Sequence, residues 1–180
     1  MSNLILVKVS KEYKNQIEDM LVEWKKFNNE HPDTYKSPAA IFYEYSNFDD
    51  YIHNLIEIGE NYDKYDSTKV PATTYFALDK ERNIMVGAVN IRHYLNDYLR
   101  QFGGHIGDGV RPSERRKGFA TEIISLALQK CKELGIDQVM ITCNENNIGS
   151  KKSIIKNGGV YQKTTTCGDE RLEIYLIDNK

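Results

Sequence analysis

The segment at residues 118–134 is marked as an amphipathic helix more clearly than any other part of the sequence. Its small and apolar side chains recur at helical spacing and form a wide stripe: Ala120, Ile123, Ile124, Ala127, Leu128, Cys131 and Leu134. Gly135 is expected to end the helix. Strand-like segments stand on both sides, at 104–110 and 138–143. Because an apolar stripe must be buried against another layer, this part of the chain predicts a helix packed on a sheet.

The remaining segments extend this pattern along the chain. Ser10 is expected to cap the first helix and Gly59 to end the second. The order of strands and helices predicts an α/β (α+β) fold, a mixed sheet with helices on its faces, in a single domain over residues 1–180. The other predicted strands are 4–9, 73–78, 85–91, 160–166 and 172–177, and the other predicted helices are 11–27, 48–58 and 149–156.

The composition excludes several classes of protein. The 24 basic and 26 acidic residues give a net charge of −2, which argues against a nucleic-acid-binding surface. The apolar runs are short and the first residues lack the features of a signal peptide, so we expect no membrane association and a cytoplasmic location. Cys131, Cys143 and Cys167 form neither a disulfide framework nor a CxxC motif, and the histidines are scattered, so no metal is expected.

The turn before the central helix is rich in groups that bind anions. The amides of the turn and of the first helical turn have no helical partner, and the helix dipole adds positive charge there. Small residues keep the wall of the turn low, so that a bulky anion reaches the backbone. The pattern predicts a pyrophosphate-binding turn. It holds the basic residues Arg111, Arg115, Arg116 and Lys117, a single acid, Glu114, and the small residues Gly118 and Ala120.

Two common phosphate-binding motifs do not fit this turn. A P-loop requires Gly-Lys-Ser/Thr at its end, whereas here Lys117 precedes Gly118. A GxGxxG dinucleotide motif that begins at Gly107 would have Pro112 in place of its third glycine.

The segment from Arg115 to Ala120 follows the pattern Q/R-x-x-G-x-G/A and is preceded by Val110-Arg-Pro112. It resembles the pyrophosphate-binding motif of the GNAT superfamily of N-acetyltransferases, which bind acetyl-CoA. The stretch ITCNENN at 141–147, the following serine, the Asn-Gly-Gly turn and the order of elements over nearly the whole chain are also similar. The sequence resembles most a bacterial branch of predicted acetyltransferases.

The resemblance implies a mostly antiparallel central sheet with helices on both faces and with strands 104–110 and 138–143 splayed apart. The pantetheine arm of acetyl-CoA would enter this gap. Gly107 and Gly109 would allow a bulge in the first of these strands, or would only relieve crowding under a helix. The residues expected to bind acetyl-CoA are Val110, Arg111, Arg115, Arg116, Lys117, Gly118, Phe119, Ala120, Thr121, Asn147 and Ser150.

Amide formation requires a neutral amine and a stabilised thiolate, for which a general base and a general acid are suited. Asp108 shares a strand face with Ile106 and Val110 by period-two alternation, and some family members carry their catalytic carboxylate on this strand. Asp108 is therefore a candidate base, and a surface or bulge-stabilising carboxylate is the alternative. His105 points to the opposite face and is expected to be structural.

The usual proton donor of the family is absent. Many members place a tyrosine seven residues after the asparagine, and Ile154 stands there in this chain. Ser150, Tyr161 or a bound water would have to replace it, and Ser150 joins Asp108 as a candidate catalytic residue.

Residues 41–66 are acidic and aromatic, and in the resembled fold they form the lip that receives the acceptor. Glu44 and Asp49 are the candidate substrate contacts, because an acidic lip suits a cationic amine, although an ordinary solvated helix face would have the same composition. The expected activity is direct transfer of an acetyl group from acetyl-CoA to a primary amine of a small molecule or protein, by a monomer or homodimer. A non-catalytic module that binds CoA is the alternative, and a nucleotide-phosphate binder is a weaker one.

Overall fold

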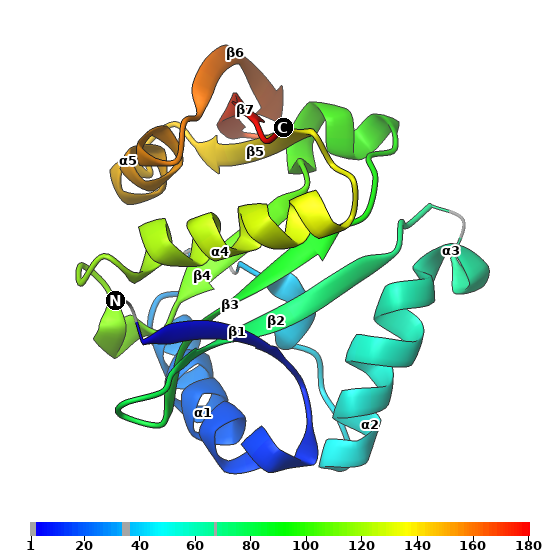
Figure 1. The fold of residues 1–180 in the computed structure, drawn as a ribbon, viewed down its shortest axis with the longest axis vertical. Helices are drawn as coiled ribbons and strands as arrows, with labels where there is room; N and C mark the ends of the chain where they lie inside the picture. The colour runs from blue at the N-terminus through cyan, green and yellow to red at the C-terminus, as the bar shows by residue number, and fades with distance from the viewer. Residues whose placement is uncertain (1–2, 34–36, 67) are drawn as a thin grey trace.

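The computed structural model describes residues 3–33, 37–66 and 68–180, and in this part of the chain the strands form one 7-stranded sheet (Figure 1). The strand order is β1-β2-β3-β4-β5-β7-β6. Every neighbouring pair is antiparallel except β4 and β5, which are parallel, so the predicted mixed and mostly antiparallel sheet is confirmed. The strands are β1 Leu4–Lys8, β2 Ala72–Asp79, β3 Ile84–Arg92, β4 Ile106–Val110, β5 Gln138–Asn144, β6 Val160–Cys167 and β7 Glu170–Asp178.

Helices cover both faces of this sheet. The apolar stripe of α4 packs with inward residues of β3, β4 and β5 in one core cluster, as its spacing predicts, except for Leu134, which follows the helix and is exposed. On the other face, Ile17, Met20, Leu21 and Trp24 of α1 pack on β2 and β3 in a second cluster. The helices are α1 Lys14–Glu30, α2 Phe48–His53, α3 Tyr62–Tyr65, α4 Phe119–Glu133 and α5 Ile148–Lys156. None of the helices in the described residues is long and apolar enough to cross a membrane.

One predicted helix boundary is confirmed and one is wrong. Ser10 is the extended N-cap residue of the helical turns that begin at Lys11 and lead into α1, but its buried hydroxyl makes no capping hydrogen bond. Gly59 has a φ of −59°, so the chain continues through helical turns as far as Asn61 instead of ending there. A π-helical turn at Leu99–Gly103, which the sequence analysis does not predict, stands before β4.

The splay between β4 and β5 is present. Among the described residues their parallel pairing is limited to Ile106 and Ile141, whereas β4 pairs with β3 along its whole length. The pairing of β3 with β4 is continuous in register, so the predicted bulge is wrong. Gly109 relieves crowding instead. A Cβ atom at this position would overlap the backbone oxygen of Ser37 and lie 2.9 Å from Cζ2 of Trp24.

This close approach gives a first prediction. Gly109→Ala should lower the free energy of unfolding by about 1–3 kcal/mol, because the backbone of Ser37 and the ring of Trp24 would have to shift. Gly107→Ala is the matched control two residues away, where the nearest atom to a Cβ is Ser37 Oγ at 3.5 Å, an ordinary contact. Urea unfolding of both variants checks this, and equal stability of the two would contradict it.

Candidate functional site

The turn that opens α4 has the backbone geometry of an anion-binding site. Gly118 has a φ of 92°, and nothing lies within 4 Å of the position of its missing Cβ. The first amide that bonds into the helix is that of Glu122, to the carbonyl of Gly118 at 3.3 Å. The amides of Phe119, Ala120 and Thr121 precede it at the positive end of the helix dipole. The turn therefore leaves open space at Gly118, where these amides begin, as the small residues of the sequence predict.

The cations of the turn divide into two groups. Arg116 and Lys117 are exposed at its tip, and Arg116 has a positive φ of 63°. Arg115 is held along the turn, with its guanidinium 4.3 Å from the ring centroid of Phe27 and its Nε donating to the carbonyl of Val110 at 3.2 Å.

Arg111 is anchored differently from the other basic residues of the turn. Its side chain is only 12% exposed and forms ion pairs with Asp19 at 2.8 Å and with Glu23, both on α1. Its amide donates to the carbonyl of Val86 at 2.9 Å. The side chain of Arg111 thus fastens the turn to α1, and the contact of Arg111 with acetyl-CoA stays a prediction.

Two carboxylates, those of Glu23 and Glu114, anchor the turn through hydrogen bonds. Glu23 accepts hydrogen bonds from the amide and hydroxyl of Ser113 at 2.8 and 3.1 Å. Glu114 is buried, accepts two bonds from Arg82 at 3.1 and 3.0 Å, and lies 3.2 Å from Lys117. Burial tends to raise the pKa of each carboxyl, but these hydrogen bonds outweigh it and lower both pKa values below the usual range. Sequence reasoning missed Glu23 and Arg82, which lie far from the turn along the chain.

The free edge of β4 presents main-chain groups to the gap. The amide of Arg111 donates to the carbonyl of Val86, and the amide of Arg92 donates to the carbonyl of His105. The backbone N–H and C=O groups of the odd-numbered residues of β4 therefore point toward β3. By the alternation of an antiparallel pair, Asp108 and Val110 direct their backbone groups toward the splayed side. The predicted gap for an extended arm is therefore lined by exposed main chain.

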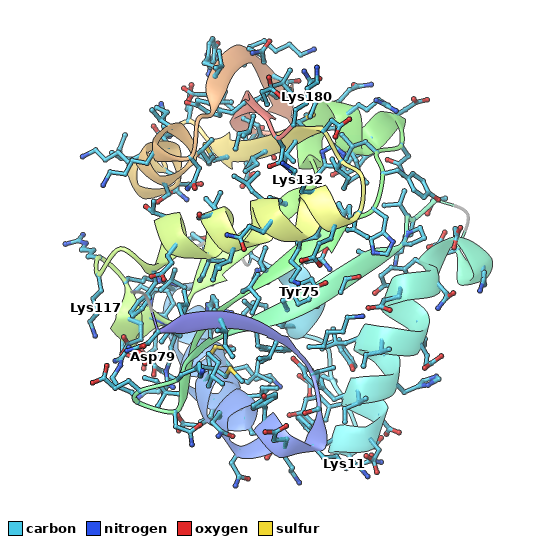
Figure 2. All side chains as sticks on the ribbon, viewed as in Figure 1. Lys11, Tyr75, Asp79, Lys117, Lys132 and Lys180 are labelled. Atoms are coloured by element: carbon cyan, nitrogen blue, oxygen red, sulfur yellow. The ribbon has the colours of Figure 1, made fainter. Side chains whose placement is uncertain are left out.

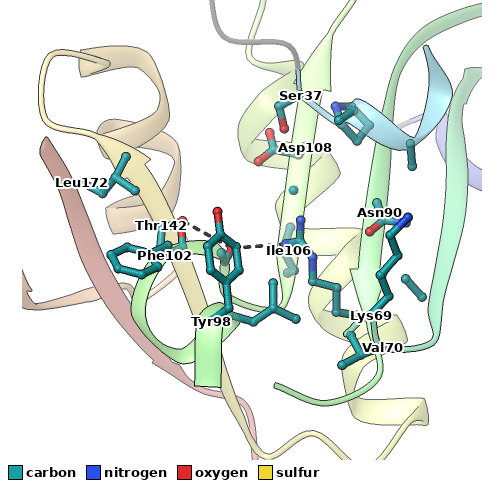
Figure 3. A pocket seen from close by; sticks show the side chains of 18 of the residues that line it. Ser37, Lys69, Val70, Asn90, Tyr98, Phe102, Ile106, Asp108, Thr142 and Leu172 are labelled. Atoms are coloured by element: carbon teal, nitrogen blue, oxygen red, sulfur yellow. Dashed lines mark hydrogen bonds between the residues drawn. The ribbon is translucent and has the colours of Figure 1, made fainter. Parts of the chain in front are cut away.

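A cavity of about 1090 Å³ extends from this gap across the sheet. Asp108, Asn147 and Ser150, three of the residues predicted from sequence, all line it. Figure 3 shows Asp108 at one end of the cavity, with Lys69 and Asn90 on one side and Phe102 and Thr142 on the other. The hydroxyl of Thr142 donates to the carbonyl of Phe102 at 3.0 Å.

Asp108 lies deep in this cavity. Burial raises the pKa of its carboxyl to about 6, although its own backbone amide acts in the opposite direction. The side chain is nevertheless only partly covered by protein atoms, since it borders the empty volume. A carboxylate with a pKa in this range is suited to take a proton near neutral pH.

The α5 side of the cavity carries a hydroxyl and a thiol. The side chain of Asn147 caps α5 by accepting the amide of Ser150 at 3.0 Å. Ser150 and Cys143 both line the cavity, and burial raises the pKa of the Cys143 thiol to about 11, although Ser150 acts in the opposite direction. Ile154, at the position of the usual tyrosine, is 0% exposed in the α4 core. Tyr161 is exposed on β6, where its hydroxyl lies 3.0 Å from Thr164 Oγ1.

The structure does not bring Glu44 and Asp49 to the cavity. The Glu44 side chain is 93% exposed and pairs with Lys25 at 3.7 Å, and Asp49 pairs with Lys11 at 2.8 Å. Neither is among the described residues that line the cavity, and their contact with an acceptor stays a prediction. The same segment contributes other residues to the wall: Tyr43, Asn54, Ile58 and Tyr62.

His105 is structural, as expected. Its ring is buried, and Nδ1 accepts the amide of Met140 at 3.0 Å. Burial and the nearby arginines lower its pKa to about 4, so the ring is neutral. No group of three or more metal-binding side chains occurs among the residues that the structure describes.

Comparison with known proteins identifies this arrangement. A family model of the acetyltransferase (GNAT) domain matches residues 10–160. The chain belongs to the GNAT acetyltransferase family. The family expected from the turn at 115–120 is thus confirmed, and the protein is an N-acetyltransferase. No curated protein matches the sequence significantly.

Solved GNAT structures share the fold at low identity. One, from Salmonella typhimurium, modifies the N-terminal serine of a 50S ribosomal subunit protein; it is 13% identical, with a TM-score of 0.61, over 97% of this chain and 94% of that one. A chimera that includes the spermidine N-acetyltransferase from Vibrio cholerae is 15% identical, with a TM-score of 0.60, over 99% and 96% of the two chains. A microcin self-immunity acetyltransferase, solved with acetyl-CoA and AMP, is 15% identical, with a TM-score of 0.66, over 97% and 92%.

The open turn at Gly118 gives a second prediction. Gly118→Val should weaken CoA binding by about tenfold or more, because the new side chain would stand over the amides that open α4. Gly135→Val is the control at the other end of the same helix, with a φ of 73° and equally empty surroundings. Both variants should lose about 1–3 kcal/mol of stability to backbone strain. Isothermal titration with CoA distinguishes them, and equal CoA affinity of the two would place the phosphate site elsewhere.

Proposed function

We propose that this GNAT enzyme transfers an acetyl group from acetyl-CoA directly to a primary amine of a small molecule or protein. The observation that carries the proposal is the cavity that joins the carboxyl of Asp108 to the gap beside β4 and to Ser150 on α5. Solved relatives with this fold act on a ribosomal N-terminal serine and, by name, on spermidine, which supports an amine as acceptor.

The residues around the turn fit the diphosphate of CoA. The amides of Phe119, Ala120 and Thr121 would bind it, and the exposed cations Arg116 and Lys117 would neutralise its charge. The backbone of Val110 would meet the pantetheine arm at the free edge of β4. A second, open hollow of about 600 Å³, lined in part by Thr121, Lys156 and Asn157, borders the turn on the α5 side and would receive the nucleotide end.

The side chains in the cavity would serve the two proton movements of amide formation. Asp108 would take the proton of the amine, whose nitrogen must be neutral to form the new C–N bond. The bond between the acetyl carbon and sulfur breaks in the same transfer, and the departing thiolate needs a hydrogen-bond donor. Of the donors that the sequence analysis proposes, Ser150 is the side chain that lines the cavity. No enzyme nucleophile is needed, so Cys143 stays a buried thiol.

One observation favours a second function, a CoA-binding module without catalysis. The position of the family's tyrosine is filled by Ile154, which is fully buried. This candidate shares the turn at 115–121 with the enzyme and differs from it only in turnover.

A third prediction separates the two functions. CoA at about 100 times its Kd should stabilise the folded protein by about 2.7 kcal/mol in either case. Only the enzyme should release free thiol from acetyl-CoA faster when an amine is added. A panel of polyamines, amino acids and peptide N-termini, followed by thiol release, is the measurement. Stabilisation without amine-dependent thiol release would favour the binding module, and no stabilisation at millimolar CoA would remove both.

The fourth prediction concerns Asp108. Asp108→Asn should lower kcat by about 10²–10⁴-fold with CoA affinity little changed, because size is kept and basicity is lost. The rate of the parent should rise with pH along an acidic limb centred near its pKa of about 6, and this limb should disappear in the variant.

The Asp108→Asn variant should be more stable than the parent at the pH at which it is less active. Burial raises the folded-state pKa of Asp108 above its unfolded value, so its ionisation destabilises the folded protein increasingly above pH 4 and fully above about pH 6. The Asn variant should therefore unfold at higher urea concentration than the parent at pH 8 and at the same concentration near pH 3.5. A variant that keeps its turnover, or that is destabilised at pH 8, would show that Asp108 is a structural carboxylate.

A further inference from the structure

One polar side chain is buried in β3, a strand whose other buried residues are glycine or apolar. Asn90 is 8% exposed there, two residues before the end of the strand. A buried amide costs free energy unless its donor and its acceptor are both hydrogen-bonded. An apolar residue would pack at this position without that cost, so the packing of the sheet does not by itself explain an asparagine at position 90.

The two ends of this amide have different surroundings. Nδ2 donates to Oγ1 of Thr74 at 3.0 Å, and Thr74, on β2, is itself only 5% exposed. Asn90 lines the cavity, on the side opposite Phe102 and Thr142 (Figure 3), whereas Thr74 is not among the described lining residues. Among the residues that the structure describes, none donates a hydrogen bond to Oδ1. The nitrogen of the amide is therefore committed to the sheet, and the oxygen is left for the cavity.

The neighbouring strand has no side chain to cover this oxygen. Asn90 pairs in register with Gly107 of β4, and residues paired in this way share a face of the sheet. Gly107 also lines the cavity. Lys69, which Figure 3 shows beside Asn90, is engaged elsewhere, with its ammonium 4.0 Å from the Asp66 carboxylate and 4.9 Å from the ring centroid of Tyr62. Asn90 thus offers a buried acceptor of fixed orientation to whatever occupies the cavity.

We propose that Asn90 binds the acceptor substrate, with Oδ1 accepting a hydrogen bond from an N–H or O–H group of that substrate. This inference rests on the proposed function, because it places an amine acceptor in this cavity. Thr74 is the positioning residue, since its bond to Nδ2 turns the oxygen of the amide, and not the nitrogen, toward the cavity. An acceptor with an apolar group at this point would leave the buried oxygen unpaired, so Asn90 selects acceptors that carry a donor there.

The first test measures kcat/KM for the acceptor in variants of Asn90. The acceptor is the polyamine, amino acid or peptide N-terminus that gives the fastest thiol release from acetyl-CoA. Asn90→Leu and Asn90→Ala should each lower kcat/KM for this amine by about 5- to 100-fold, the cost of leaving a donor unpaired in a buried site. The affinity for CoA should not change.

The matched control is Thr73→Val on the neighbouring residue of β2. Thr73 is also 5% exposed, and its hydroxyl lies 2.8 Å from Nε2 of His93, so it too belongs to a buried polar pair. Neither Thr73 nor His93 is among the described residues that line the cavity. The control should therefore keep the kcat/KM of the parent, whatever its effect on stability.

Stability distinguishes an amide that binds substrate from one that only supports the fold. Thr74→Val combined with Asn90→Leu replaces both partners of the hydrogen bond by apolar groups, a change that is nearly neutral or stabilising for a folded core. We expect this double variant to unfold at the same or a higher urea concentration than the parent, with the low kcat/KM of Asn90→Leu. Thr74→Ser, which keeps the anchoring hydroxyl, should retain more of kcat/KM than Thr74→Val.

Titration of the same amine into the protein saturated with CoA needs no turnover, and Asn90→Leu should weaken this binding as well. Unchanged kcat/KM and binding in the Asn90 variants, or a loss confined to the larger leucine, would overturn the inference while the enzyme stays an acetyltransferase. A double variant that is less stable and keeps the kinetics of the parent would likewise show that the pair is structural. Absence of thiol release with every amine would overturn the proposed function, and with it this inference.

Discussion

The divergence of β4 from β5 beyond Ile106 is the constraint on which the rest of the site depends. Parallel strands that separate leave backbone donors and acceptors without a ladder partner, and such groups must be satisfied in another way. In this chain one of them, the carbonyl of Val110, accepts a bond from Arg115, and the others face an open gap. The same divergence creates the cavity that desolvates Asp108. One break in the pairing therefore supplies main-chain binding groups and a carboxyl of raised pKa together.

The turn above α4 is rigid because carboxylates hold it from two directions. Glu23 ties Ser113 and Arg111 to α1, and Glu114 ties the turn to Arg82 in the loop between β2 and β3. Hydrogen bonds to charged groups contribute about 1.5–3 kcal/mol each when they are well formed. Arg111 is fully engaged in these ion pairs, Lys117 is half-exposed and also pairs with Glu114 at 3.2 Å, and Arg116 is exposed at the tip. The number of basic residues in the turn therefore overstates the number that face an anion.

The cavity wall differs in charge from the acidic segment at residues 41–66. Residues 41–66 are acidic, but Glu44 and Asp49 lie on the outer surface, where lysines pair with them. The residues of this segment that reach the cavity, such as Tyr43 and Tyr62, are uncharged aromatics. The cations that line the cavity, Lys69 and Arg92, come from outside that segment. Two carboxylates, Asp108 and Glu170, line the cavity as well, so the acidic character of segment 41–66 does not carry over to the cavity wall.

The sequence by itself determined the features that depend on neighbouring residues. Helical spacing predicted α4, alternation placed Asp108 on the face of Ile106, and the run from Val110 to Thr121 predicted the backbone turn that opens α4, because a backbone turn and a helix terminus are local structures. Only the tertiary structure showed that β4 has no bulge. Position 109 requires glycine because the backbone of Ser37, in a loop far away in the sequence, packs against it. The tertiary structure alone also showed that Arg111 pairs with acids on α1 and which residues line the cavity, because these partners lie many residues apart in the sequence. Periodicity shows which face a side chain takes, but the groups that meet it there are set by long-range packing.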